Sequence, residues 1–186
     1  MKSLRLSKSH NYLEGYYDSF TNYKSHLLTT ILIVPTLALV TISRLGRIKS
    51  PNFLYGEKIP KKYTPYGKDI HPSFYWFGFP KETKSFVIIC EDPDTPSGKI
   101  FTHWAVKNIP VNIKKIEEGQ SIGEEIKNSW GFERYSGPKP PNGTHRYFFR
   151  IYDIKFENFS SKTLNGLKKD IEFNKIAEAE MIGIFG

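Results

Sequence analysis

The chain has 186 residues, of which 39% are hydrophobic and 25% are charged. This is enough for one ordinary domain with its own core and too short for two full ones. The 14 Phe, 11 Tyr and 3 Trp exclude a mostly disordered chain, and together with 14 Gly and 12 Pro they favour β-structure with many turns.

The net charge of +8 favours anionic partners such as phosphate groups, acidic membrane surfaces or nucleic acid. The basic residues are spread along the chain without a run of five, so we do not expect nucleic acid as a partner. Cys90 is the only cysteine and ends an apolar run. We therefore expect a buried, inert thiol, and the count excludes an internal disulfide and a cysteine-rich zinc site.

Residues 1–45 are predicted to be an N-terminal extension and residues 46–186 the folded domain. Residues 25–43 carry no charged side chain. As a helix they would cover roughly 28 Å, close to a hydrocarbon core of about 30 Å. Three interpretations stay open: a membrane anchor, a cleaved signal peptide and a soluble segment. The protein is accordingly expected to be cytoplasmic or anchored to a membrane through residues 25–43. Basic residues at both ends leave the orientation undecided.

From residue 47 onward, Pro and Gly interrupt the chain every few residues, with short aromatic runs between them. This texture is typical of short strands joined by tight turns. The strongest strand candidates are residues 84–90, 102–109 and 146–154. Helical patterns occur late, at residues 164–169 and again near 174–180.

An acidic, proline-rich loop, Asp92-Pro93-Asp94-Thr95-Pro96, directly follows the first of these strands. Prolines make such a loop rigid, and rigid polar loops at strand ends often carry binding groups. The next strand opens with His103 after a short connection. We expect His103 to lie near Asp92 or Asp94, where a carboxylate would raise the pKa of the imidazole.

A second motif is a Gly- and Pro-rich loop, residues 136–144, that leads into a strand headed by His145. Alternation along that strand would place His145 and Tyr147 on one face, with Arg146 opposite. The backbone N–H of Gly137 would approach a ligand, because glycine permits close contact, and Tyr147 would add a hydroxyl donor.

Three site chemistries can be built from these residues. A metal site could use Asp92, Asp94, His103 and His145, but their spacing matches no compact ligand signature. A hydrolase could use a histidine oriented by an aspartate, but no nucleophile motif accompanies them. A small anion pocket needs only oriented donors and fits best. We therefore expect neither a metal nor a cofactor.

At these motifs the sequence resembles the phosphatidylethanolamine-binding protein family, in its bacterial and archaeal Raf-kinase-inhibitor-like branch. The family pattern Asp-Pro-Asp-x-Pro stands at residues 92–96, and its His-Trp strand start at residues 103–104. The pattern Gly-Pro-x-Pro-Pro…Gly-x-His-Arg-Tyr stands at residues 137–147. The resemblance extends in order over roughly residues 47–186.

The resemblance implies a mainly β fold: a large central antiparallel sheet, a smaller second sheet and a C-terminal helix. It also implies a small pocket at one end that takes phosphate or a phospholipid headgroup. Carried over residue by residue, that pocket would be lined by Asp92, Asp94, His103, Gly137, Pro138, His145 and Tyr147. Because eukaryotic relatives inhibit kinases or proteases, a regulated protein partner is implied as well.

We predict a non-enzymatic protein that binds a small phosphate-bearing anion weakly, at micromolar affinity or poorer. His103 and His145 would donate to the anion, while Asp92 and Asp94 would hold the imidazoles and the loop in place. Two alternatives are a hydrolase or lyase acting on a phospho-substrate and a membrane-tethered interaction module.

Overall fold

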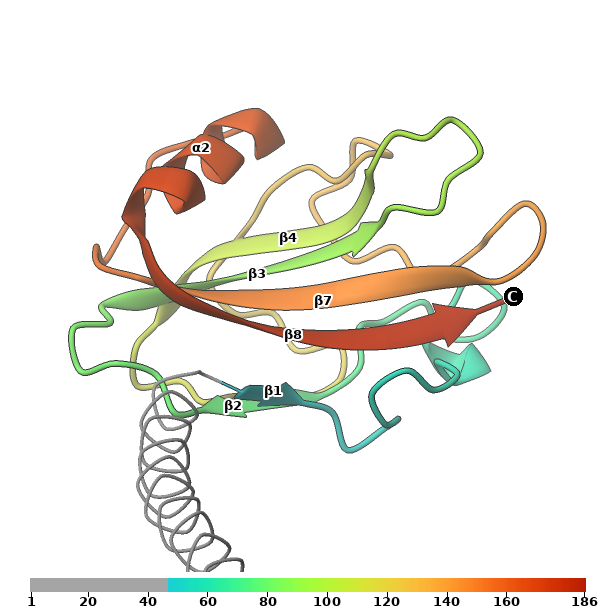
Figure 1. The fold of residues 1–186 in the computed structure, drawn as a ribbon, viewed down its shortest axis with the longest axis horizontal. Coiled ribbons are helices and arrows are strands. Elements are labelled where there is room, and N and C mark those ends of the chain that lie inside the picture. The colour runs from blue at the N-terminus through green and yellow to red at the C-terminus, as the bar shows by residue number, and fades with distance from the viewer. Residues whose placement is uncertain (1–46) are drawn as a thin grey trace, which may run out of the picture. The chain divides into compact units, whose positions relative to one another are not determined.

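The computed structural model describes residues 47–186, which form two antiparallel β-sheets and one α-helix (Figure 1). The smaller sheet has the strand order β1-β2-β5, with β1 at Arg47–Lys49, β2 at Phe74–Phe77 and β5 at Lys115–Ile116. The larger sheet has the order β6-β4-β3-β7-β8, with β6 at Glu124–Glu125, β4 at Phe101–Pro110, β3 at Ser85–Asp92, β7 at His145–Ile154 and β8 at Lys175–Phe185. A 3-10 turn, Lys61–Tyr63, precedes β2, and helix α2, Leu164–Asn174, precedes β8. The prediction of a mainly β fold with a large sheet, a smaller sheet and a late helix is confirmed.

The main hydrophobic core lies between the two sheets. Phe149 of β7 contacts Phe74 of β2, with ring centroids 4.8 Å apart, and in this way joins the sheets across the core. Cys90 is fully buried in the same layer. Burial raises the pKa of its thiol well above the usual value, as expected for an unreactive cysteine.

A second core fills the space between the larger sheet and α2 (Figure 1). Val87 and Ile89 of β3 face Leu167 and Ile171, the two buried side chains of the helix. Because β3 is the central strand and is covered on both faces, all eight of its residues are buried. This explains why it reads as a continuous apolar run rather than an alternating one.

The structure confirms strands close to all three predicted ranges. It also confirms a helix over residues 164–169, which starts after Thr163, whose hydroxyl accepts the N–H of Gly166 at 3.1 Å. The second helical prediction, near residues 174–180, is wrong, because α2 ends at Asn174 and residues 175–180 belong to β8. Ala and Glu favour a helix locally, but β8 pairs with β7 along its length, and tertiary pairing overrides propensity.

The outer edge of β8 is partly paired by the segment that follows β1. Gly56 donates its N–H to the carbonyl of Ile182 at 2.8 Å, and Ile59 donates to the carbonyl of Ile184 at the same distance. Ile184 in turn donates to the carbonyl of Glu57 at 2.9 Å. These bonds satisfy backbone groups that an edge strand would otherwise present to solvent.

The predicted anchor at residues 25–43 lies outside the residues that the structure describes. Between residues 47 and 186, no helix has both the length and the apolar character needed to cross a membrane.

Phe149→Ala is expected to lower the free energy of unfolding by about 3–5 kcal/mol, because it opens a cavity between the sheets. Phe173→Ala is the matched control, since Phe173 is 72% exposed on α2, and its effect should stay within about 0.5 kcal/mol. Urea unfolding followed by tryptophan fluorescence measures both. Equal losses in the two variants would contradict the placement of the core.

Candidate functional site

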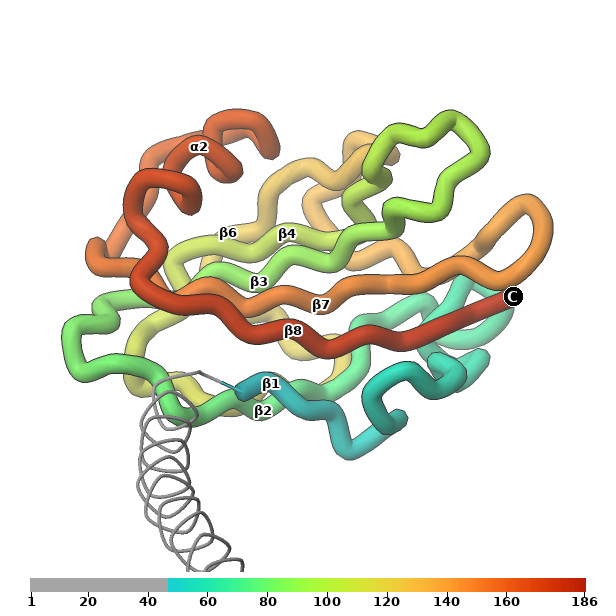
Figure 2. Tube along the Cα trace, in the orientation of Figure 1, coloured from blue at the N-terminus to red at the C-terminus, as the bar shows by residue number. Residues whose placement is uncertain are grey.

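The residues predicted for the site gather at one end of the larger sheet, where β3 ends and β4 and β7 begin. Antiparallel pairing sets Asp92 opposite Phe101 of β4 and Glu91 opposite Phe148 of β7. The β3–β4 loop and the loop before β7 therefore lie at the same end of the sheet, at the right of Figure 2. Two motifs that are about 50 residues apart in sequence thus meet in space.

Asp92 connects the two motifs. Its Oδ2 accepts a hydrogen bond from Nδ1–H of His145 at 2.7 Å, and its Oδ1 accepts the backbone N–H of Asp94 at 2.8 Å. Both side chains of the ion pair are buried. One carboxylate therefore shapes the acidic loop and fixes the ring orientation of His145.

Asp94 binds Arg146 and not an imidazole. It accepts from Nε at 2.8 Å and from Nη2 at 2.6 Å, and also from the backbone N–H of Arg146 at 2.9 Å. These hydrogen bonds lower the pKa of Asp94 from 3.8 to about 2. Arg146 points to the exposed side, while His145 and Tyr147 are buried, so the predicted alternation is confirmed.

His103 has a different partner from the one predicted. Its Nδ1 donates to the backbone carbonyl of Ser136 at 2.6 Å, and burial lowers the pKa of the imidazole below its usual value of 6.5. The negative charge of Asp92 does raise the pKa of His103, as predicted, but burial outweighs this effect, so the predicted net rise is wrong. A bulge in β4 accompanies the changed partner of His103. Cys90 and Glu91 of β3 pair with Trp104 and Thr102, so His103 between them has no partner in the β3–β4 pairing.

Tyr147 lies between these groups and is fully buried. Its ring meets that of His103 edge-on, with centroids 5.2 Å apart. Among residues 47–186, no group forms a hydrogen bond with the Tyr147 hydroxyl. Burial raises the pKa of Tyr147 well above its usual value, so the group stays a neutral hydroxyl donor.

Gly137 contributes in a way that the sequence did not predict. Its N–H donates to Oδ1 of Asp69 at 2.7 Å and so is already bonded within the protein. A Cβ at this position would collide with the backbone carbonyl of Tyr63, so only glycine fits. Gly137 therefore packs the loop against the segment after the 3-10 turn Lys61–Tyr63, and Pro138 lies buried next to it.

Asp69 and Ser136 are the two contributors that sequence reasoning missed. Asp69 has a φ of 53°, in the left-handed region that non-glycine residues rarely adopt, and such residues concentrate at functional sites. Ser136 acts through its carbonyl oxygen, which every residue possesses. Neither role has a signature in the sequence.

The site can bind a group that accepts hydrogen bonds. Because Nδ1 of His103 and of His145 is already used, Nε2 is the nitrogen left for a ligand in each ring. Nε2 can donate a hydrogen bond only when the ring carries two protons, because Nδ1 already holds the first one. Between residues 47 and 186, no group of three or more His, Cys, Asp or Glu side chains is placed to hold a metal ion.

The comparisons with known proteins identify similar chains. A family model described as phosphatidylethanolamine-binding protein matches residues 49–186. The UPF0098 protein of Aquifex aeolicus is 40% identical over 149 residues, which cover 73% of this chain and 85% of that protein. The UPF0098 protein of Methanothermobacter thermautotrophicus is 36% identical over 137 residues, which cover 69% of this chain and 90% of that protein.

Two solved structures have a similar fold. The phosphatidylethanolamine-binding protein homologue CT736 from Chlamydia trachomatis has a TM-score of 0.73 and 31% identity, covering 77% of this chain and 98% of that one. Escherichia coli YbcL, described as a member of the mammalian PEBP family, has a TM-score of 0.71 and 26% identity, covering 75% and 97%.

Arg146→Gln is expected to return the pKa of Asp94 from about 2 toward its ordinary 3.8, because the bidentate hydrogen bonds are lost. In the native protein the pKa is depressed, so this pair stabilises the fold above about pH 4 and loses that effect as the pH falls toward 2. Carboxyl ¹³C NMR measures the titration, with Arg134→Gln as the control that leaves Asp94 unchanged. A native pKa near 3.8 would contradict the paired geometry.

Proposed function

The chain belongs to the phosphatidylethanolamine-binding protein family, and from this premise we propose that it binds a small phosphate-bearing anion. The anion, either free or as a phospholipid headgroup, would sit against His103, His145 and Tyr147. The family and the fold indicate this end of the larger sheet as the place of the site.

The unpartnered hydroxyl of Tyr147 is the observation that carries this proposal. A buried polar group without a partner costs about 1–3 kcal/mol, and native proteins rarely leave one unpaired without a reason. An anion oxygen at this position would accept a hydrogen bond from the hydroxyl. The cost is then removed when the ligand binds, which favours the bound state.

The two imidazoles supply the charge. Asp92 holds His145 and the Ser136 carbonyl holds His103, so both rings are oriented before the ligand arrives and little side-chain entropy is lost on binding. The carboxylate of Asp92 also repels an anion. We therefore expect affinities in the micromolar to millimolar range.

Binding is favoured over turnover by the partners of the two histidines. Among residues 47–186, neither His103 nor His145 is hydrogen-bonded to a hydroxyl or thiol that could act as a nucleophile. Cys90 is buried, and its raised pKa keeps it protonated. The exposed loop residues 96–100 and 141–144 border the site, and a regulated protein partner would contact the anion-loaded protein there.

Tyr147→Phe tests the proposal through two opposite effects. The free energy of unfolding should stay equal or rise by up to about 1–3 kcal/mol, because an unpaired hydroxyl is removed. The affinity of the full-length chain for inorganic phosphate and for phosphoethanolamine should fall by about 10- to 100-fold, which corresponds to one lost hydrogen bond to a charged group. Urea unfolding and isothermal titration measure the two effects, and vesicles with and without phosphatidylethanolamine distinguish a headgroup from free phosphate.

Tyr135→Phe is the matched control. The hydroxyl of Tyr135 donates to the carbonyl of Tyr63 at 3.1 Å, so its loss should destabilise the fold by about 1 kcal/mol and leave the affinity unchanged. The proposal fails if Tyr147→Phe destabilises the protein in the same way and does not weaken anion binding.

Sulfate affinity should rise as the pH falls from about 8 to 5, since the imidazolium form binds the anion and sulfate itself does not titrate there. Burial places the pKa of His103 below 6.5, so uptake of its proton strengthens binding by up to about tenfold per pH unit until that lowered pKa is reached. His103→Asn keeps a donor for the Ser136 carbonyl and should flatten the profile. A flat profile in the native protein would contradict the mechanism.

A further inference from the structure

A cleft of about 550 Å³ lies between the larger sheet and α2, on the face of the sheet opposite the two histidines. Its volume is within the range of small-molecule sites. Alternation along β7 separates the two faces: Tyr147 and Phe149 point into the core between the sheets, whereas Arg150 and Tyr152 line the cleft. The cleft is therefore distinct from the anion site proposed above.

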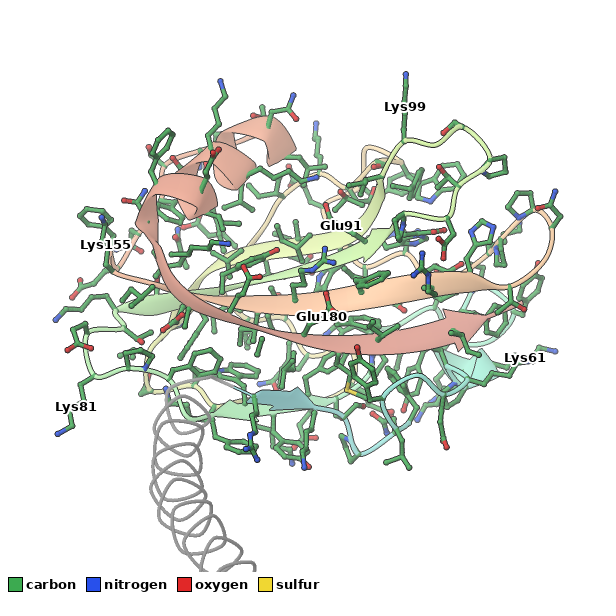
Figure 3. All side chains as sticks on the ribbon, in the orientation of Figure 1. Lys61, Lys81, Glu91, Lys99, Lys155 and Glu180 are labelled. Carbon is green, nitrogen blue, oxygen red and sulfur yellow. The ribbon has the colours of Figure 1, made fainter. Side chains whose placement is uncertain are left out.

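On the sheet side of the cleft, Arg150 and Lys168 share the carboxylate of Glu91. Arg150 donates from Nε to Glu180 at 2.7 Å and from Nη1 to Glu91 at 3.2 Å. Lys168 of α2 forms an ion pair with the other oxygen of Glu91, with Nζ and Oε1 2.6 Å apart. Figure 3 shows Glu91 on β3 and Glu180 on β8, on either side of the strand that carries Arg150.

Arg150 retains hydrogen-bonding capacity for a ligand. A guanidinium has five N–H donors. The two carboxylates engage Nε and Nη1, and the Tyr152 hydroxyl also lies within hydrogen-bonding range of Arg150, which leaves part of the donor set for a ligand. Because the neighbouring acids hold the side chain in place, its orientation is fixed before a ligand arrives. The arrangement suits a carboxylate or phosphate group, which arginine can bind in a planar, bidentate manner.

The helix side of the cleft supplies an acid. Glu172 lines the cleft and forms no ion pair with any residue between 47 and 186. Glu178 lines it as well and pairs with Lys175 at 2.6 Å. An ammonium group at this end would therefore meet one free carboxylate and one that is shared.

Apolar side chains form the remaining part of the lining. Ile89 on the sheet and Ile171 on the helix are both almost fully buried and line the cleft, and the exposed Ile100 completes this lining. A short aliphatic chain would contact these surfaces without loss of hydrogen bonds.

The balance of charges selects the kind of ligand. Three cationic and four acidic side chains line the cleft, so a purely anionic or purely cationic guest would face like charges. We propose that this cleft binds a small zwitterion, a molecule with a carboxylate or phosphate at one end and an ammonium at the other. Arg150 and Lys168 bind the anionic end, and Glu172 binds the ammonium.

The test is a ¹H–¹⁵N NMR titration of the full-length chain with 4-aminobutyrate, which has the two charges and a short chain between them. Butyrate and butylamine, each with one of the charges, are the matched probes. Saturable shifts of the amides of residues 168–175 and of Arg150 are expected with 4-aminobutyrate alone. Saturation by either single-charge probe at the same concentration, or no saturation by 4-aminobutyrate, would overturn the proposal.

Glu172→Gln should raise the dissociation constant for 4-aminobutyrate about three- to tenfold, because an exposed charge partner is lost. Glu133→Gln makes the same change of charge at an exposed position outside the cleft and should have no effect. Tyr147→Phe should also leave this titration unchanged. An equal effect of both glutamine variants, or loss of binding in Tyr147→Phe, would show that the zwitterion does not bind under α2.

Discussion

The hydrogen bond between Asp92 and His145 is the contact on which the arrangement of the candidate site depends. It exists because β3 and β7 pair along their length, which brings the end of one strand to the start of the other. The second oxygen of Asp92 holds the N–H of Asp94, so the same carboxylate determines the conformation of the loop. A shift of one residue in this pairing would turn Asp92 to the opposite face of the sheet and separate the two motifs.

The larger sheet separates two groups of polar side chains, one on each of its faces, and adjacent residues of β3 belong to different groups. Glu91 and Asp92 follow each other on β3, and successive side chains on a strand point to opposite faces. Asp92 meets His145 beside the main core, while Glu91 meets Arg150 and Lys168 below the helix. Both acids are buried and paired, as a carboxylate in a protein interior requires. The last two residues of one strand therefore organise both proposed sites.

The sequence predicts the strands well, because a buried central strand and an alternating strand leave clear hydrophobic patterns. It fails at residues 174–180, where local propensity and long-range pairing disagree. The motifs also predict that His103, His145 and Tyr147 lie close together. They do not predict the partner of His103, because residue types do not indicate the bulge in β4. The bond between Gly137 and Asp69 spans 68 positions and depends on a backbone angle. The cleft under α2 was not predicted, because its charges come from separate elements without a local motif.

The pairing of residues 56–59 with the end of β8 also bears on how copies of the protein meet one another. A long outermost strand with free backbone groups is a template onto which a strand of another molecule can add. Here the stretch 182–184 is already occupied from outside, and Glu178 and Glu180 place two negative charges on the preceding half of the strand. Intermolecular sheet extension along β8 is thereby disfavoured, which helps a β-rich, aromatic-rich domain to resist aggregation.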